Sequence, residues 1–233
     1  MTNNKVINLI LDIIFPSYCL GCGKYLKNGA TLCPSCFLKI GVNKTLFCGK
    51  CRARLPENKK ICHLDFPYVL GAAASYRDET AKELVHNLKF KGVRDASVRL
   101  GELLIKYLKE LDLDLENFLI IPVPLGKKRL RSRGFNQAEL LAKEVARHFN
   151  LPIIPNALAR NKETKPQTEL KSLEERFNNL KESFSASDDK IISGKNILLI
   201  DDVSTSGATL NAAAAALKKS GAKKIIALVA ALA

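Results

Sequence analysis

The seven cysteines of this 233-residue chain all lie within its first 62 residues, and their spacing restricts how that segment can fold. Two C-x2-C pairs are followed by a second set of three cysteines, and the full set is Cys19, Cys22, Cys33, Cys36, Cys48, Cys51 and Cys62. A shift of 29 residues carries the first three cysteines onto the last three, and carries Cys36 onto Asp65. The repeat predicts two tandem units of one design.

Paired C-x2-C motifs are typical of tetrahedral zinc sites, in which thiolates surround the metal in a closed structural shell. The segment has few large apolar residues, and a module this small needs a metal to hold its fold. With no secretory segment in view, we expect a reducing compartment and no disulfide framework. The first unit therefore predicts a zinc site made of Cys19, Cys22, Cys33 and Cys36.

The second unit offers three thiolates and leaves its fourth ligand open. Asp65 occupies the position equivalent to Cys36, and zinc accepts a carboxylate oxygen, so Cys48, Cys51, Cys62 and Asp65 form a tentative second site. His63, next to Cys62, is a rival fourth ligand. A second unit that has lost its metal is the remaining alternative.

Residues 6–15 form a short apolar run that Asp12 interrupts. The run is too short to span a membrane and lacks a small-residue cleavage site. Its apolar residues recur at helical spacing, which predicts a short amphipathic helix packed on the protein. A helix lying on a membrane surface is the alternative. We expect a cytoplasmic protein without a membrane span.

The chain is basic, with 37 Lys and Arg against 23 Asp and Glu and a formal charge of +14. Such a surplus favours anionic partners, which include phosphate-rich small molecules, nucleic acid and acidic membrane surfaces. The cysteine-rich segment shares this charge but holds few aromatic residues. Proteins that bind single-stranded nucleic acid usually combine a basic groove with aromatic residues on which bases stack. The segment is therefore only weak evidence for nucleic-acid binding, and a solvated basic surface is the alternative.

Beyond Pro67, apolar runs with strand character alternate with helical patterns. We expect strands at 68–75, 118–123, near 153, 197–200 and 224–231, and helices at 79–90, 96–111, 137–149, 173–180 and 208–219. This alternation predicts an α/β domain with a parallel sheet covered on both faces. The expected organisation is a zinc module over residues 1–66 and an α/β domain over 67–233, with ligands at the carboxyl ends of the strands.

One segment of the α/β domain carries the candidate site. An apolar strand leads into Asp201 and Asp202, and a Thr-Ser-Gly turn and a helix follow. The unpaired N–H groups at a helix start attract phosphate, whereas paired carboxylates suit sugar hydroxyls or Mg²⁺. A phosphorylated sugar offers both. A nucleotide hydrolase would also need a G-x-x-x-x-G-K-[ST] loop, which the sequence lacks. Capping of the turn by one aspartate is the minor alternative.

Residues 197–210 resemble the 5-phosphoribosyl-1-pyrophosphate (PRPP) motif of type I phosphoribosyltransferases. Several further segments resemble the ComF competence-protein family: 15–16, 85–90, 121–125, 129–138 and 165–184. The likeness runs over nearly the whole chain. It implies a type I phosphoribosyltransferase-like domain behind a double zinc ribbon.

The resemblance assigns roles residue by residue. Asp201 and Asp202 are the candidate catalytic residues and would hold the ribose hydroxyls, directly or through Mg²⁺. The 5′-phosphate would be wrapped by Thr205, Ser206, Gly207, Ala208 and Thr209. Pyrophosphate would face Val123, Pro124 and Leu125, with Arg129 and Arg133 from the cation-rich run at 127–133. We expect that run to be a mobile flap, the alternative being a solvated charge cluster. Gln167, Arg176 and Asn179 either line the site or brace a helix.

Two functions follow from the resemblance. The first is transfer of phosphoribosyl from PRPP to an unknown acceptor with release of pyrophosphate, linked to DNA uptake in natural transformation. Thr205 stands where purine-salvage enzymes usually carry an aspartate, which argues against purine salvage. The alternative is a non-catalytic, PRPP-responsive accessory protein that contacts single-stranded DNA or a competence helicase.

Overall fold

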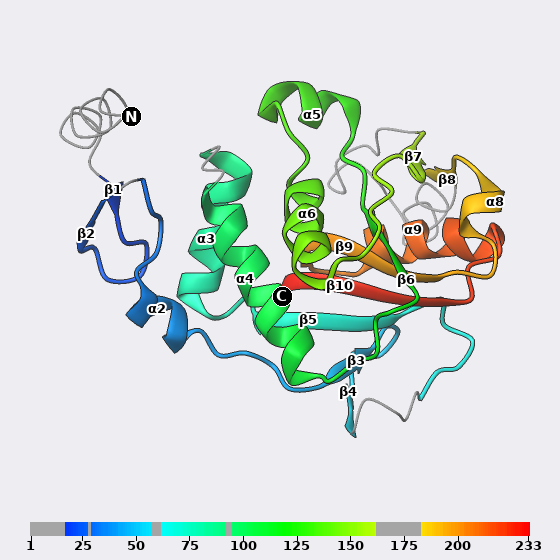
Figure 1. Ribbon diagram of the computed structural model, residues 1–233, viewed down its shortest axis with the longest axis horizontal. Coiled ribbons are helices and arrows are strands. Elements are labelled where there is room, and N and C mark those ends of the chain that lie inside the picture. Colours follow the sequence, from blue (N-terminus) through cyan, green and yellow to red (C-terminus); the bar gives the residue numbers. More distant parts are fainter. Residues whose placement is uncertain (1–16, 28, 57–61, 92–94, 162–182) are drawn as a thin grey trace, which may run out of the picture.

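A six-stranded sheet with the order β4-β3-β5-β10-β9-β6 organises the chain (Figure 1). The computed structural model describes residues 17–27, 29–56, 62–91, 95–161 and 183–233. Four strands are parallel to one another: β5 (Val69–Ser75), β10 (Lys224–Leu232), β9 (Asn196–Ser204) and β6 (Phe118–Pro122). The expected parallel α/β sheet is thereby confirmed.

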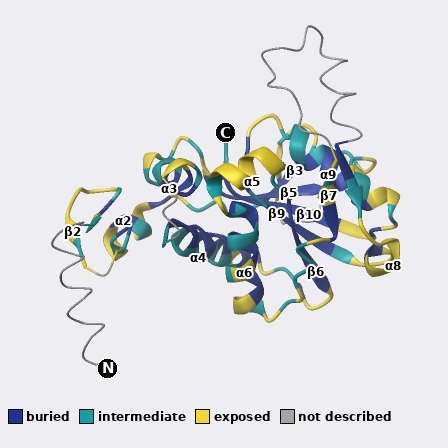
Figure 2. Ribbon diagram, turned by 90° about the horizontal axis from the view of Figure 1, so that it is seen from above, coloured by how far each residue is buried: buried dark blue, intermediate teal, exposed yellow. Residues whose placement is uncertain are grey.

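Helices cover both faces of this sheet because its central strands alternate their side chains between two cores. Leu198 and Ile200 of β9 pack in the core beneath three helices: α3 (Glu79–Phe90), α4 (Asp95–Glu110) and α6 (Gln137–Phe149). Ile197 and Leu199 pack in the opposite core with α9 (Ala208–Lys219). Figure 2 shows the buried strands enclosed between these layers. The arrangement explains why β9 is apolar at successive positions.

The smaller elements complete the α/β layers. The helix α5 (Lys127–Arg133) follows β6, and a two-stranded antiparallel sheet pairs β7 (Leu158–Arg160) with β8 (Phe184–Ala186). The short helix α8 (Asp189–Ile192) leads into β9. Among the described residues, none of the helices is long and apolar enough to cross a membrane.

The cysteine-rich segment divides between two places in the fold. Its first part holds β1 (Ser17–Tyr18), β2 (Tyr25–Leu26) and α2 (Pro34–Lys39), and it lies beside α3 and α4 (Figure 1). The backbone N–H and the hydroxyl of Thr31 both donate to Asp95 Oδ2, each at 2.9 Å, and so attach this part to the start of α4.

The second part of that segment joins the main sheet. The strand β3 (Leu46–Cys48) pairs antiparallel with β5, and β4 (Arg54–Leu55) pairs with β3. The division of the chain at residue 67 therefore stays a prediction, because one hydrogen-bonded sheet runs across it.

Several expected elements agree with the structure and others differ. The helices at 79–90, 137–149 and 208–219 have the expected bounds. The strand expected at 197–200 extends to Ser204, and residue 153 makes a single parallel bridge to Ile120. Residues 127–133 form a helix, and their expected role as a mobile flap stays a prediction. The helices expected at 6–14 and 173–180 lie outside the described residues, as do Gln167, Arg176 and Asn179.

Candidate functional site

Two adjacent carboxylates lie at the carboxyl end of β9, within the strand rather than after it. The side chain of Asp202 is only 3% exposed and forms an ion pair with Lys89, whose Nζ lies 3.0 Å from Asp202 Oδ1. Asp201 Oδ1 accepts from the backbone N–H of Asp202 at 2.8 Å. Lys89 is the next-to-last residue of α3, so this helix supplies the cation that balances a buried charge.

Burial and the neighbouring carboxylate of Asp202 raise the pKa of Asp201 to about 8. Both causes disfavour a second negative charge at this position, because two carboxylates this close repel each other in a poorly solvated site. Lys89 opposes the rise. Near neutral pH Asp201 therefore holds a proton, until a cation or a set of hydroxyl donors favours its ionised form.

The raised pKa predicts how stability depends on pH. Between the pKa of an unfolded aspartate, about 4, and the folded value of about 8, the native state binds more protons than the unfolded state. The free energy of unfolding therefore falls as pH rises through this window. We expect Asp201→Asn to lack this decline, measured by urea unfolding from pH 5 to 9 without ligand. Parallel curves for the wild type and the variant would contradict the assignment.

A short turn reverses the chain between the end of β9 and the start of α9. Gly207 has φ 78°, in the left-handed region that glycine adopts freely, and it precedes the first helical residue, Ala208. The Ser206 hydroxyl accepts from the Ala208 N–H at 3.4 Å. The loop therefore presents the amino end of a 12-residue helix, where backbone N–H groups and the helix dipole favour an anion.

A second turn, at the end of the neighbouring strand β6, faces the same region. The Val123 N–H donates to Ile200 of β9 at 2.8 Å, and the Asn136 side chain donates to the Val123 carbonyl at 3.1 Å. Asn136 also caps α6 by accepting from the Ala138 N–H. Because β6 and β9 are adjacent and parallel, both turns emerge at one edge of the sheet.

One cavity of about 390 Å³, the β9 cavity, brings most of the predicted site residues together. Of the expected residues it contains Asp201, Asp202, Thr205, Thr209, Val123, Pro124, Leu125, Arg129 and Arg133. Ser206, Gly207 and Ala208 do not line it. The residues that sequence reasoning gave no role are Lys89, Phe90, Asn136, Gln137, Arg160 and Val203. Four of these residues lie in segments that resemble the ComF family: Lys89 and Phe90 in 85–90, and Asn136 and Gln137 in 129–138. The resemblance therefore indicated the segments but gave these residues no role.

Three buried polar atoms in the walls of the β9 cavity have no hydrogen-bond partner among the described residues. They are Asp202 Oδ2, Arg133 Nη1 and Gln137 Oε1. A buried polar atom without a partner carries a cost of about 1–3 kcal/mol. Two acceptor oxygens and one donor nitrogen left unpaired around one cavity therefore indicate a polar ligand.

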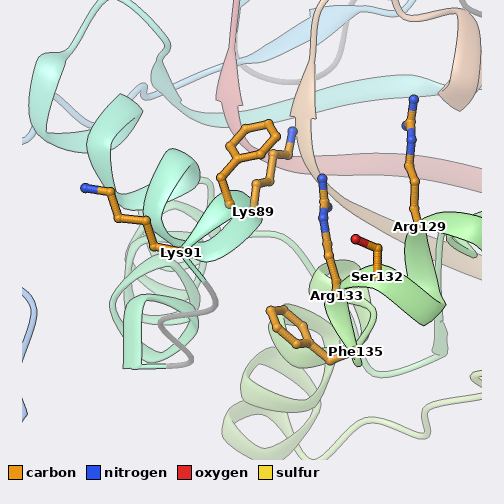
Figure 3. A pocket seen from close by; sticks show the side chains of 7 residues that line it. Lys89, Lys91, Arg129, Ser132, Arg133 and Phe135 are labelled. Carbon is orange, nitrogen blue, oxygen red and sulfur yellow. The ribbon is translucent and has the colours of Figure 1, made fainter.

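A second cavity of about 530 Å³, the α3–α5 cavity, adjoins the first. The two share Lys89, Phe90, Arg129 and Arg133 as lining residues. In Figure 3 the side chains of Lys89, Arg129 and Arg133 extend in the same direction from α3 and α5. Phe90 is 68% exposed, and the Arg133 guanidinium lies 5.5 Å from the centre of its ring. The two cavities form one basic region with an exposed aromatic ring.

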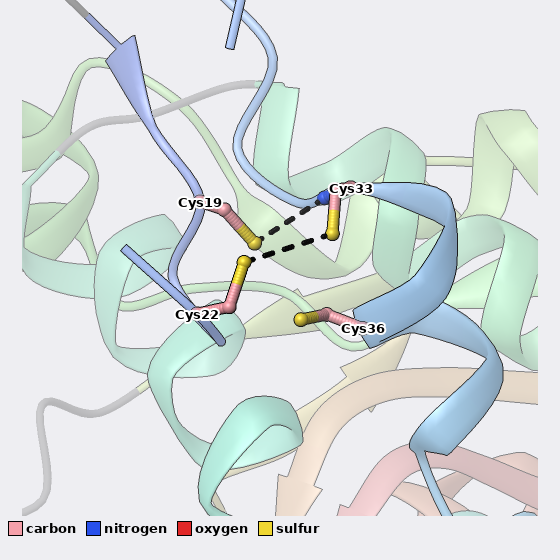
Figure 4. A group of neighbouring side chains, drawn as sticks. All are labelled: Cys19, Cys22, Cys33 and Cys36. Atoms are coloured by element: carbon pink, nitrogen blue, oxygen red, sulfur yellow. Dashed lines mark hydrogen bonds between the residues drawn. The ribbon is translucent and has the colours of Figure 1, made fainter. Parts of the chain in front are cut away.

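The first four cysteines form the cluster that their spacing predicts. The side chains of Cys19, Cys22, Cys33 and Cys36 surround one centre (Figure 4), and their sulfur atoms lie within 4.8 Å of one another. Tetrahedral Zn–S bonds place sulfur atoms roughly 3.8 Å apart, and the Cys22–Cys33 distance is 3.9 Å. The Ser35 hydroxyl lowers the pKa of Cys33 to about 6, which favours the thiolate that zinc needs. The arrangement supports structural zinc.

The second cluster consists of Cys48, Cys51, Cys62 and His63, whose ligand atoms also lie within 4.8 Å of one another. His63 Nδ1 is 3.3 Å from both Cys48 Sγ and Cys62 Sγ. Asp65, the tentative fourth ligand, is not in this group, and the rival residue takes its place. The imidazole next to Cys62 reaches the sulfur atoms from its own position in the chain, and the choice of the fourth ligand stays a prediction.

Comparison with known proteins agrees with both halves of the structure. The family described as "Phosphoribosyl transferase domain" matches residues 135–233, and "Double zinc ribbon domain" matches residues 10–64. "DNA utilization protein YhgH" of Escherichia coli (strain K12) is 29% identical over 211 residues, covering 89% of this chain and 86% of the relative. "Competence protein ComFC" of Bacillus subtilis is 38% identical over 106 residues, covering 46% of this chain and 40% of the relative.

The likeness to "Competence protein F" of Haemophilus influenzae extends over almost the whole length of both proteins. The two are 32% identical over 222 residues, which cover 89% of this chain and 92% of the relative. The chain therefore belongs to the competence protein F (ComF) family, in which a phosphoribosyl transferase domain follows a double zinc ribbon.

Proposed function

We propose that the β9 cavity binds PRPP with its phosphosugar between the paired carboxylates and the start of α9. The observation that carries this proposal is the convergence of paired acids, a helix start, cationic side chains and unpaired buried polar atoms on one cavity. The acids alone would repel a phosphorylated ligand, and the helix start alone would not select a sugar. A phosphoribosyl group needs both.

Each part of the ligand has a partner in this arrangement. Asp201 and Asp202 accept hydrogen bonds from the ribose hydroxyls, and the loop at 205–209 holds the 5′-phosphate with its backbone N–H groups. The diphosphate lies against the turn at 123–125, where Arg129 and Arg133 offset its charge. The ion pair with Lys89 holds Asp202 in place before the ligand arrives.

The donor set also fits Mg²⁺. This ion prefers oxygen ligands and is held by one or two carboxylates together with substrate phosphates, and Asp202 has one buried carboxylate oxygen without a partner among the described residues. Asp201 and Asp202 would hold it. When bound, Mg²⁺ supplies charge that stabilises the departing pyrophosphate. For transfer of phosphoribosyl to an acceptor, the protein's part is to fix the ribose and neutralise the diphosphate, and the α3–α5 cavity gives the acceptor a place beside the sugar.

Titration calorimetry with PRPP, with and without Mg²⁺, tests the site without knowledge of the acceptor. We expect saturable one-site binding that tightens when Mg²⁺ is present, because the ion offsets charge shared by the ligand and the two acids. Pyrophosphate release measured in the same samples separates an enzyme from a binding protein. Absence of PRPP binding in both conditions would overturn the proposal.

The second cysteine cluster gives a prediction about the metal. We propose that it holds zinc through three thiolates and His63, which also lies within the matched ribbon at residues 10–64, whereas Asp65 lies outside it. The wild-type chain should carry two zinc ions, and His63→Ala should lose one of them. Asp65→Asn is the matched control and should keep both. Metal analysis of the purified proteins decides this, and loss of zinc in the Asp65 variant alone would restore the carboxylate as the ligand.

A role in DNA handling is supported by the relatives' names and by charge. Relatives are named for competence and for DNA utilization, and this chain carries a formal charge of +14. We propose that PRPP binding is linked to DNA uptake, either through catalysis or through an accessory protein that binds single-stranded DNA or a helicase. Binding of a fluorescent oligothymidylate should weaken steeply with salt. Oligothymidylate binding without any pyrophosphate release would favour the accessory protein.

A further inference from the structure

Arg52 extends from the second cysteine cluster to the phosphate loop. It follows Cys51 directly, and its guanidinium donates from Nη2 to the Thr205 carbonyl and from Nη1 to the Ala233 carbonyl, the latter at 3.1 Å. Thr205 and Ala233 are themselves adjacent, because the Ala233 N–H donates to Ser204 at 2.9 Å. One side chain therefore joins the end of β9, the end of β10 and the cysteine cluster.

The backbone that carries Arg52 is the turn that a metal in the second cluster would fix. The Arg52 N–H donates to the Cys48 carbonyl at 2.9 Å, and the Cys48 N–H donates to Ala53 at 2.8 Å. Arg52 has φ 59°, a left-handed conformation that costs energy for a residue with a side chain. Binding of one metal by both Cys48 and Cys51 would hold the turn between them, and Arg52 after it, in this conformation.

The contact with Thr205 fixes the orientation of the peptide bond between Thr205 and Ser206 in the phosphate loop. In a trans peptide the carbonyl and the following N–H point in opposite directions. With the Thr205 carbonyl directed to Arg52, the Ser206 N–H is directed away from Arg52. Tyr68 supports the loop from the same side as Arg52: its hydroxyl lies 3.2 Å from where a Cβ on Gly207 would be, and Arg52 Nη2 lies 3.7 Å from that point.

We propose that Arg52 is a positioning residue for the 5′-phosphate loop, and that the metal in the second cluster acts on phosphate binding through it. This rests on the proposed function, because it assigns the loop to the 5′-phosphate. Arg52 itself contacts backbone carbonyls. The zinc ribbon is thereby part of the sugar-phosphate site, although it contributes no group to the ligand.

The test compares two ligands that probe different parts of the site. The affinity for ribose 5-phosphate reports on the loop at 205–209, and the affinity for inorganic pyrophosphate reports on the turn at 123–125. In Arg52→Ala, loss of a charge-assisted contact should weaken ribose 5-phosphate binding by about tenfold to a hundredfold, with pyrophosphate binding and zinc content unchanged. Arg52→Lys keeps the charge but not the planar fork and should lose less. Arg54 is the exposed residue of β4, so Arg54→Ala is the matched control and should bind both ligands as the wild type does.

Removal of the second metal tests the coupling. Cys62→Ser removes a metal ligand that lies outside the Cys48–Cys51 turn. It should weaken ribose 5-phosphate binding as much as Arg52→Ala does. The double variant should lose no more than either single variant, because both changes act through one contact. Additive losses, or normal affinity in the zinc-depleted protein, would overturn the role of the metal. Normal ribose 5-phosphate affinity in Arg52→Ala would overturn the role of Arg52.

Hydrogen exchange separates this proposal from the proposed function. If the wild-type protein binds neither PRPP nor ribose 5-phosphate, the proposed function fails, and the structural link is still measurable in the ligand-free protein. We expect faster exchange of the amides at 204–209 in Arg52→Ala than in the wild type or in Arg54→Ala. Equal exchange in all three proteins would show that Arg52 does not hold the loop.

Discussion

Replacement of both β9 carboxylates by amides, Asp201→Asn with Asp202→Asn, is expected to weaken PRPP binding by more than about a hundredfold. Charge-assisted hydrogen bonds are worth about 1.5–3 kcal/mol each, and every 1.4 kcal/mol is about tenfold in affinity. The substitution removes two charges and halves the number of acceptor oxygens while keeping the shape of the side chains. Calorimetry with PRPP and Mg²⁺ measures the loss.

The chain contains a matched control for this experiment. Asp188 and Asp189 are also adjacent, both are exposed, and they lie at the start of α8 outside the β9 cavity. Their conversion to asparagine removes the same number of carboxyl groups and leaves a residue that still caps a helix well. An equal loss of affinity in this control would show that overall charge, and not the β9 pair, governs PRPP binding.

A third variant guards against misfolding. Asp202→Asn removes the partner of a largely buried lysine, so the double variant loses stability as well as ligand contacts. Asp201→Asn alone keeps the Lys89–Asp202 pair and removes one of the two proposed ribose contacts. We expect it to bind PRPP at least tenfold more weakly than the wild type while unfolding cooperatively. Unchanged affinity in this folded variant would place the sugar elsewhere.

Local sequence patterns predicted the parts of the fold that depend on local causes. The helices at 137–149 and 208–219 have apolar residues at helical spacing, and the strand before Asp201 is apolar because both of its faces are covered. The family resemblance assigned the turn at 123–125 to the pyrophosphate, and the turn lies at the same edge of the sheet as the carboxylates because β6 and β9 are parallel neighbours. The cysteine spacing likewise predicted the first cluster.

The contacts that complete the site join segments far apart in the chain. Arg52 and Thr205 are separated by 153 residues, and no local pattern links them. Lys89 lies in a segment, 85–90, that resembles the family, but its ion pair with Asp202 depends on the last turn of α3 lying beside the end of β9. In the second cluster the 29-residue repeat predicted Asp65 as the fourth ligand. The side chain that lies within 4.8 Å of the three sulfur atoms is instead the imidazole of His63, next to Cys62.

Removal of the Lys89 charge is expected to produce the largest loss of stability at the site. In Lys89→Met the apolar part of the side chain is kept, and Asp202, 3% exposed, loses its cation. Breaking a buried ion pair from one side costs about 3–5 kcal/mol. The loss should be largest above pH 8, where Asp201 is also ionised: burial raises the pKa of Asp201 to about 8, Lys89 opposes that rise, and its removal extends the decline in stability to higher pH.

The same helix offers the comparison that makes this result specific. Lys82 of α3 pairs with Glu79 on the surface, where the two side chains are 42% and 76% exposed. Lys82→Met should change the free energy of unfolding by no more than about 0.5 kcal/mol, because solvent screens exposed pairs. Lys89→Met with Asp202→Asn should recover much of the lost stability, since both members of the buried pair are then uncharged. Urea unfolding at pH 6 and pH 9 distinguishes the variants. If Lys89→Met and Lys82→Met have the same free energy of unfolding at pH 9, the ion pair with Lys89 does not stabilise the buried Asp202. Solvent, and not the end of α3, would then offset the charge of the carboxylates.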